Sequence, residues 1–214
     1  MKKLMPFAFL MLILVLAACT TDKIPRNAPK STVLIKDEFI DSKWGWDTLN
    51  DANGSLVSYA GGGLRILVNQ PNFDYWTRIH QVLNDARIEV DAIKLGGADD
   101  NAFGILCRYQ DQANHYRFIA SSDGYAGIAK MRSGKLSLIH ASQMTYSAVI
   151  NRGSAVNRLR ADCVGQDLYF YVNGSLVAQA KDADLTAGEV GLMAGANGTT
   201  PVDMLFDHFV VIQP

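Results

Sequence analysis

From Thr32 to the end of the chain, short stretches of alternating apolar and polar residues follow one another, with turn residues between them. Residues 87–93 alternate between polar and apolar, as a strand with one buried face should, and we interpret residues 64–68 and 116–119 in the same way. This part of the chain shows no convincing helical period. Further strands are predicted at 102–110, 125–131, 135–140, 157–164, 167–173, 175–180, 188–194 and 203–212.

Glycine-containing turn pairs such as Asn53-Gly54, Asp123-Gly124 and Asn173-Gly174 separate these strands. Many short strands with such turns indicate an all-β sandwich or jelly roll. The chain has 214 residues, of which 49% are hydrophobic, enough for one domain with a sizeable core after an export leader. We therefore expect a single β-sandwich domain over residues 32–214.

The first eighteen residues have the pattern of an export signal. Lys2 and Lys3 precede an apolar stretch that is too short for a comfortable membrane span. The stretch ends in Leu16-Ala17-Ala18-Cys19, which resembles the bacterial lipobox. That resemblance implies a signal peptide over residues 1–18, cleavage before Cys19, and acylation of Cys19, with palmitate among the chains. The alternatives are an ordinary signal peptide, or a buried helix that happens to end in cysteine.

Residues 19–31 would then form a lipidated, proline-containing tether. The expected location is extracytoplasmic, lipid-anchored in the cell membrane or the outer membrane. Thr20 in place of aspartate favours the outer membrane in a host that has two. The formal net charge of −1 gives no electrostatic reason to expect a nucleic-acid partner.

Residues 157–172 are expected to form a hairpin in which Cys163 faces Leu168 and Ala161 faces Phe170. This register points Cys163 into the core, and Cys107 shares an alternation with other core-like residues. Export would permit a Cys107–Cys163 disulfide. Two separate buried thiols are the alternative.

The other face of the hairpin combines tyrosines and arginines, which could stack on sugar rings and bind hydroxyl groups. Trp76 could add an aromatic platform at a sheet edge. The alternatives are a solvated sheet face with half-buried tyrosines, and a tryptophan that anchors the core. The candidate ligand-binding residues are Trp76, Arg108, Arg158, Arg160, Tyr169 and Tyr171.

The run from Phe103 to Asp111, followed by Asn114 to Phe118, resembles a motif of concanavalin A-like lectin/glucanase domains. The 3-keto-disaccharide hydrolase-type and laminin-G-like modules are similar. The resemblance covers residues 33–212, and the segments 168–174, 188–192 and 206–211 support it. It implies a jelly-roll sandwich of two antiparallel sheets, one of them concave, with the two chain ends on neighbouring strands. It does not specify an activity, because many functions share this fold.

A glucanase on this fold would carry the motif E-x-D-x-x-E, which supplies a nucleophile and an acid. The nearest match runs from Glu89 to Lys94, and a lysine occupies the third carboxylate position. Glu89 and Asp91 are therefore interpreted as the solvent side of a strand. This argues against that glucanase mechanism and leaves other hydrolases open. The four histidines show no metal-ligand spacing, so no catalytic residue is predicted.

No cofactor is predicted, although oxygen-rich segments leave calcium open as an alternative. Asp37 and Asp207 could approach each other if the end strands pair, and Asp99-Asp100-Asn101 forms an acidic loop. Acidic residues that cap turns would give the same pattern.

The sequence thus favours a membrane-anchored β-sandwich module that binds carbohydrate or another envelope or extracellular ligand without catalysis. One alternative is a glycoside hydrolase of the 3-keto-disaccharide type, so the question of an enzyme stays open. The other is a structural or protein-interaction lipoprotein. Clustered carboxylates or histidines in the groove would favour the enzyme, and an open aromatic strip would favour sugar binding.

Overall fold

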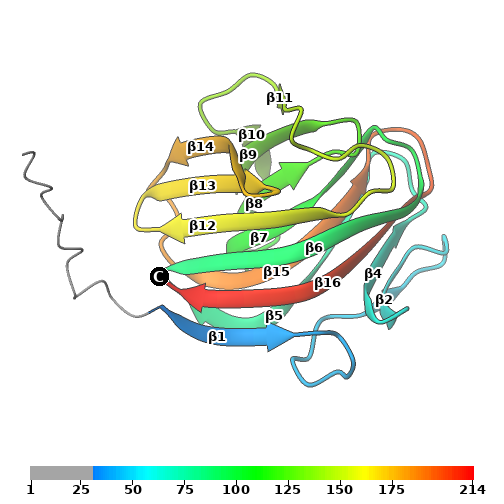
Figure 1. Ribbon diagram of the computed structural model, residues 1–214, viewed down its shortest axis with the longest axis horizontal. Helices are drawn as coiled ribbons and strands as arrows, with labels where there is room; N and C mark the ends of the chain where they lie inside the picture. Colours follow the sequence, from blue (N-terminus) through cyan, green and yellow to red (C-terminus); the bar gives the residue numbers. More distant parts are fainter. Residues whose placement is uncertain (1–30) are drawn as a thin grey trace, which may run out of the picture.

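The computed structural model describes residues 31–214 of the chain (Figure 1). Within them, sixteen strands form two stacked antiparallel sheets. The all-β fold predicted from the alternation pattern is confirmed. This part of the chain contains no helix of the length and apolarity needed to cross a membrane. The predicted signal peptide and Cys19 lie outside the described residues.

The nine-stranded sheet contains both the first and the last strand of the chain. Its members are β1 (Thr32–Asp37), β2 (Leu49–Asn50), β3 (Leu56–Ala60), β4 (Gly63–Val68), β6 (Ala86–Gly97), β12 (Asn157–Val164), β13 (Asp167–Val172), β14 (Ser175–Lys181) and β16 (Val202–Gln213). Their order is β14-β13-β12-β6-β16-β4-β3-β2, and β1 also pairs with β16.

The seven-stranded sheet packs against it. Its members are β5 (Phe73–Leu83), β7 (Asn101–Asp111), β8 (Asn114–Ala120), β9 (Tyr125–Arg132), β10 (Lys135–Leu138), β11 (Thr145–Tyr146) and β15 (Gly188–Ala196). Their order is β10-β9-β8-β7-β15-β5, and β11 pairs with β9.

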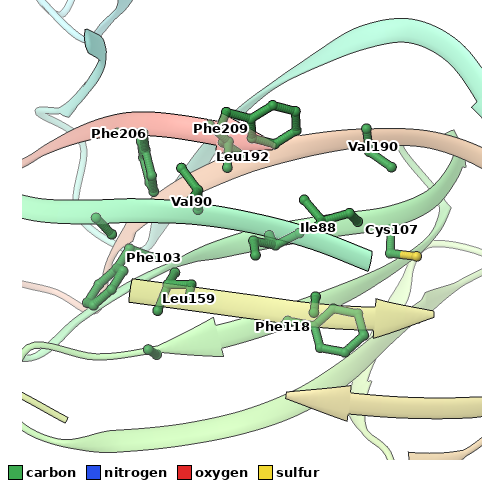
Figure 2. Close-up of a cluster of buried hydrophobic side chains, with 14 of the residues drawn as sticks. Ile88, Val90, Phe103, Cys107, Phe118, Leu159, Val190, Leu192, Phe206 and Phe209 are labelled. Atoms are coloured by element: carbon green, nitrogen blue, oxygen red, sulfur yellow. The ribbon is translucent and has the colours of Figure 1, made fainter. Parts of the chain in front are cut away.

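The core lies between the sheets, where the longer strands contribute alternate side chains (Figure 2). Phe118 of β8 meets Phe170 of β13 edge to face, with ring centroids 5.8 Å apart, and so joins the two layers. Phe103, Phe206 and Phe209 are likewise buried, each 3% exposed or less. The alternation that predicts the strands is therefore the alternation that fills the core.

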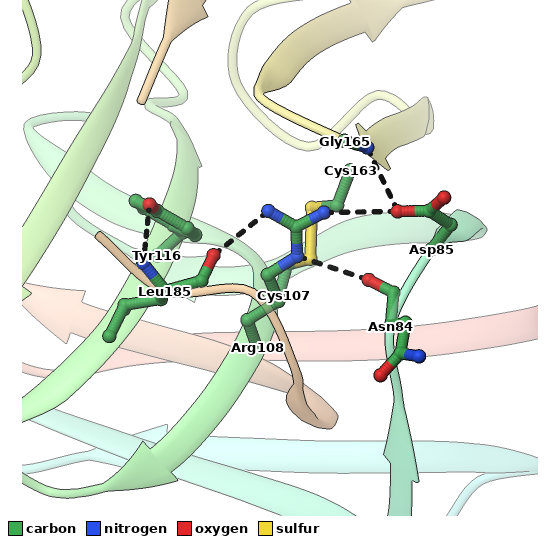
Figure 3. Close-up of a disulfide and its surroundings, with 8 residues drawn as sticks. All are labelled: Asn84, Asp85, Cys107, Arg108, Tyr116, Cys163, Gly165 and Leu185. Carbon is green, nitrogen blue, oxygen red and sulfur yellow. Dashed lines mark hydrogen bonds and ion pairs between the residues drawn. A yellow bond between two sulfur atoms is a disulfide. The ribbon is translucent and has the colours of Figure 1, made fainter. Parts of the chain in front are cut away.

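A disulfide joins the two sheets between Cys107 of β7 and Cys163 of β12 (Figure 3). The hairpin register predicted from sequence is confirmed, because Cys163 pairs with Leu168 and Ala161 with Phe170. Both cysteines are buried, and their Cα atoms lie 6.9 Å apart. The prediction of a Cys107–Cys163 bridge is confirmed, and the alternative of two separate thiols is wrong.

Arg108 is not on the ligand-binding face for which it was a candidate. It follows Cys107 where β7 bulges, has a φ of 51°, and is 2% exposed (Figure 3). Its guanidinium donates to the carbonyl oxygens of Asn84 and Leu185 and pairs with Asp85. Simple alternation misplaces Arg108 because the bulge adds a residue to the strand. Its role is to fasten the loops beside the disulfide.

The two ends of the sandwich contain different parts of the chain: one has the disulfide, and the other has three of the connections between strands. Thr32 pairs with Gln213, so the first and last strands, β1 and β16, are neighbours, as the family resemblance implies. Ile212 pairs with Arg87 and Cys163 with Ala86, which places the start of β1 and the end of β16 at the same end of the sandwich as the disulfide. The opposite end carries the connections β6–β7, β8–β9 and β15–β16. We call these the anchor end and the loop end.

Asp37 and Asp207, the predicted calcium candidates, have different partners in the structure. Asp37 is buried, and its carboxylate accepts hydrogen bonds from the Trp46 indole and the Phe39 amide, both at 2.8 Å. Asp207 instead lies near Glu38 and His208, with ligand atoms of the three side chains within 4.8 Å of one another. Asp37 therefore fixes the aromatic residues beneath it, and calcium binding by this chain stays a prediction.

Candidate functional site

The outer face of the seven-stranded sheet carries a second apolar cluster, separate from the core. It forms because alternate residues of these strands point away from the nine-stranded sheet. Trp76 and Leu138 pack against its buried members. These members are 7% exposed or less, so the cluster is a small second core on the outside of the sheet, and its contact with a ligand depends on a hollow above it. The buried members are Leu106, Tyr109, Ile119, Ala129 and Met193.

A hollow of about 310 Å³ opens over this cluster. Ala102, Ile119 and Met193 are among the residues of its floor, and Leu138 and Met144 form a wall on the side of β10. Its polar lining comes from Asp74, Arg117, Ser137 and Asn197. An apolar floor with a few polar groups at its sides is the usual composition of a small-molecule site.

Arg117 is the central charged residue of the hollow. It projects from β8 and is only 2% exposed. Its Nη1 donates to the Asp74 carboxylate at 2.5 Å, and its Nε donates to Nε2 of His115 at 3.0 Å. The guanidinium also lies 5.6 Å from the Trp76 ring centre, within range of a cation–π contact. These partners hold one rigid donor group against the floor of the hollow.

The hydrogen bonds of His115 define its tautomer. Arginine can only donate, so Nε2 must be the accepting, unprotonated nitrogen. Nδ1 then carries the proton and donates to the Asp111 carbonyl at 3.1 Å. Burial, reinforced by the Arg117 charge, lowers the pKa of His115 from 6.5 to about 4. His115 is thus a neutral support for Arg117 at physiological pH.

The unfolding free energy is expected to fall as the pH drops from 6.5 to 4. Below pH 6.5, His115 becomes protonated in the unfolded chain, whereas in the folded chain it stays neutral down to about pH 4. Protonation therefore stabilises the unfolded state over this range. The loss is about 3 kcal/mol, because one pKa unit corresponds to about 1.4 kcal/mol. Urea unfolding at pH 7 and pH 4 measures it, by comparing the native chain with His115→Gln.

His140→Gln is the matched control, because His140 is exposed. The native chain should lose about 3 kcal/mol more than the His115→Gln variant between the two pH values. The His140→Gln variant should follow the native chain. Equal pH dependence for the native chain and His115→Gln would contradict the neutral, buried state of His115.

A stack of flat groups continues from His115 toward β5. The Tyr109 ring stacks on His115 with centroids 5.1 Å apart, and the Arg78 guanidinium lies 4.6 Å from the centre of the Tyr109 ring. Arg78 is held by Asp47 at 2.9 Å and by Glu189 at 3.0 Å. Both of the site's arginines are therefore neutralised by carboxylates.

A small residue opposite Asp74 allows this geometry. A Cβ at Gly195 would overlap the Asp74 carboxylate, so only glycine leaves room for that group. Asp74 therefore depends on a neighbouring strand for the position from which it holds Arg117.

The structure separates the predicted ligand-binding residues into two groups. Trp76 lies in the apolar cluster on the outer face of the seven-stranded sheet. Arg158, Arg160, Tyr169 and Tyr171 lie half-buried on the outer face of the nine-stranded sheet. The predicted hairpin face therefore exists, but the structure does not bring it together with Trp76.

Ion pairs already occupy the arginines on that second face. Arg158 pairs with Glu89 at 3.0 Å and with Asp91 at 3.3 Å. Arg160 pairs with Asp162, and its guanidinium lies 4.5 Å from the centre of the Tyr171 ring. Glu89 and Asp91 belong to the E-x-D-x-x-E-like segment of β6. They are half-buried on the solvent side of their strand, as predicted, and on the sheet opposite the hollow.

Sequence reasoning missed Arg117, Asp74 and Asn197. A signal for Arg117 was present, since alternation in residues 116–119 puts Arg117 on the same face as the apolar Ile119. A charged residue on an otherwise apolar outer face is unusual enough to mark a site. Asp74 and Asn197 gave no such signal, because only the sheet pairing of β5 with β15 brings their strands together.

Comparisons with known proteins bear on the fold. No protein-family model matches this chain, and no curated protein matches it significantly. The carbohydrate-binding module CBM66 from Bacillus subtilis superimposes with a TM-score of 0.63 at 18% identity, over 79% of this chain and 96% of that one. A Bacillus licheniformis β-glucanase gives 0.61 at 14% identity, over 84% and 97%. The fold is a concanavalin A-like jelly roll.

A Bacillus subtilis protein of unknown function with a galectin-like fold is also similar, with a TM-score of 0.62 at 12% identity, over 85% of this chain and 96% of that one. The predicted fold class is confirmed by these likenesses. This jelly roll is shared with a carbohydrate-binding module and with glycoside hydrolases. At such low sequence identities, structural similarity shows only that the fold is shared, so a function must be argued from the site.

Proposed function

We propose that this chain is a carbohydrate-binding module that takes its ligand in the hollow on the outer face of the seven-stranded sheet. The observation that carries the proposal is the combination of an apolar floor with Arg117 and Asp74 at its side. Sugar rings have apolar C–H faces and a rim of hydroxyl groups. A site with apolar contacts below and fixed polar groups beside them complements both.

The hollow is a better candidate than the hairpin face of the nine-stranded sheet. There, Arg158 and Arg160 are held by the carboxylates of Glu89, Asp91 and Asp162 on a sheet surface. In the hollow, Asn197 and Ser137 present polar groups beside apolar side chains, whereas the hollow of about 280 Å³ at Tyr169 is lined mainly by polar residues. A mainly apolar lining with a few polar groups is the more usual composition of a small-molecule site.

Replacing Trp76 with alanine is expected to reduce affinity for a bound glycan at least tenfold. Trp76 packs against the floor and supports Arg117 from one side, so its loss disturbs both apolar and polar contacts. A glycan array probed with the full chain, in a detergent without a sugar headgroup, identifies the ligand. Calorimetric titration of that glycan into native and variant chains then gives the change.

Tyr171→Ala is the matched control, because it removes an aromatic residue from the other outer face. It should leave the affinity unchanged, and Asn197→Ala should lower it with little effect on folding, since Asn197 is exposed. A blank array would count heavily against sugar binding. Loss of affinity in Tyr171→Ala alone would move the site to the nine-stranded sheet.

The hydrolase alternative is tested with the same ligand. A glycosidase generally needs two carboxyl groups flanking the scissile bond. The hollow itself holds one carboxylate, Asp74, which is ion-paired with Arg117, and two further carboxylates, Asp100 and Asp123, line the neighbouring hollow. Incubating the full chain with the array-identified glycan should release no new reducing ends. Their release, abolished by Asp74→Asn, would favour the enzyme.

We also propose that acyl chains on Cys19 hold the module at a membrane outside the cytoplasm. The support is the resemblance of residues 16–19 to the lipobox, together with a disulfide that fits an oxidising compartment. Cys19→Ser should abolish metabolic labelling with a palmitate analogue and release the chain from the membrane fraction. Unchanged labelling would contradict the assignment of Cys19.

A further inference from the structure

A second hollow, of about 370 Å³, continues the first toward the loop end of the sandwich. The two share Met144 and Asn197 in their linings, so they lie side by side, and we treat them together as one groove. Asp100, Asp123 and Tyr125 line the second hollow. The groove thus has an apolar inner part over Ile119 and Met193 and a more polar outer part.

The outer part has an aromatic side chain that the core does not use. Tyr125 is 41% exposed at the start of β9, and it pairs across strands with Tyr146 of β11. The two rings meet edge to face, with centroids 5.7 Å apart. Tyr146 closes over Gly124, where a Cβ would lie 2.8 Å from its ring. Tyr146 therefore fixes Tyr125, whose ring stays partly open to solvent.

The polar groups of the outer part suit hydroxyl groups. Asp100 accepts a hydrogen bond from Asn197 at 3.0 Å, and Asp123 accepts one from Ser121. Carboxylates accept hydrogen bonds, and amides both donate and accept, so the set can satisfy a polyol. Across both hollows the charged lining residues are Asp74, Asp100, Asp123 and Arg117, and Arg117 is paired with Asp74. The remaining negative charge disfavours an anionic ligand.

We infer that the groove holds an uncharged oligosaccharide of at least two sugar units, with Tyr125 as the stacking platform for the outer unit. This inference rests on the proposed function and specifies its ligand. The inner unit lies over the apolar floor beside Arg117, and the outer unit lies between Tyr125 and the Asp100 and Asp123 carboxylates. The affinity should therefore rise with chain length from one unit to two.

The test uses the full chain and matched series of neutral gluco-, manno- and galacto-oligosaccharides from one to four units, with uronic-acid and sulfated oligosaccharides beside them. For the series that binds, the disaccharide should bind at least tenfold more tightly than the monosaccharide. Tyr125→Ala should remove roughly tenfold of the affinity for the longer members and leave the monosaccharide unchanged. Tyr125→Trp should restore that affinity.

Tyr169→Ala, on the other sheet, is the control and should change neither affinity. Thermal unfolding of each variant shows whether the fold is intact, and Tyr125→Trp tests the platform if Tyr125→Ala fails to fold. Two results would overturn this inference but leave the proposed function in place, provided that binding depends on Trp76. The first is equal affinity for one and two sugar units. The second is an affinity that neither Tyr125 variant changes. Tighter binding of the anionic series would also overturn the inference. Glycan binding that is unchanged by substitution of Trp76 and of Asn197 would overturn both the proposed function and this inference.

Discussion

Replacing Cys107 and Cys163 together with alanine is expected to lower the free energy of unfolding by about 4 kcal/mol. The bridge closes a loop with a sequence separation of 56 residues, and its loss returns that loop's freedom to the unfolded chain. For a domain of this size, the loss corresponds to a fall in Tm of roughly 10 °C. Urea unfolding and differential scanning calorimetry of the native chain and the double variant measure both quantities.

Reduction of the native chain provides the control for this prediction. Because both sulfur atoms are buried, a thiol reagent should label neither cysteine until a reductant is added under unfolding conditions. The reduced chain should then match the double variant in stability to within about 1 kcal/mol, the difference coming from the two small cavities. A double variant as stable as the native chain would show that the bridge contributes no net stability.

Replacing Arg117 with methionine is expected to cost about 3 kcal/mol of stability and to abolish glycan binding. Methionine keeps the apolar stem but leaves Asp74 without its cation and Nε2 of His115 without a donor. Breaking a buried pair costs roughly 3–5 kcal/mol, and the lower end applies because the Asp74 side chain is 31% exposed. Urea unfolding gives the stability, and titration with the array-identified glycan gives the affinity.

Arg160→Met is a matched control for Arg117→Met. Arg160 also pairs with an aspartate and lies over an aromatic ring, but its side chain is 31% exposed and it belongs to the other sheet. Its replacement should cost less, about 1 kcal/mol, because the buried Asp162 keeps a second cation, Arg87, at 3.2 Å. It should leave glycan affinity unchanged. Equal effects of the two substitutions would remove the special role assigned to Arg117.

Most of the strands and the core were predictable because one alternation rule governs both. The predicted strand at 157–164 coincides with β12, and the register around Cys163 follows from the shared apolar faces. Strands β1, β3 and β5 were not among the predicted ones, and β2 and β11, of two residues each, carry no alternation. The alternation rule placed Arg108 on the wrong face because Arg108 lies in a bulge of its strand.

The site was less predictable than the fold, because its residues meet across strands that are distant in sequence. Trp76 was identified as a candidate from its aromatic surroundings alone. Its neighbour Arg117 comes from β8, and the Asp74 that holds Arg117 comes from β5. Neither partner is adjacent to the other in the strand order, since β7 and β15 lie between them. The contact between Asp74 and Arg117 depends on the order of the strands in the sheet, and this order cannot be derived from the alternation pattern of the sequence.

The separation of the anchor end from the loop end has a consequence for how the protein would meet its ligand. Thr32 enters the sandwich at the anchor end, beside Gln213, where Figure 1 shows the start of β1 close to the C-terminus. The outer part of the groove opens at the loop end, beside Asp100 and Asn197. A tether from a lipid on Cys19 would reach the sandwich at the end opposite the groove mouth. The proposed anchoring would therefore leave the groove accessible to glycans from outside.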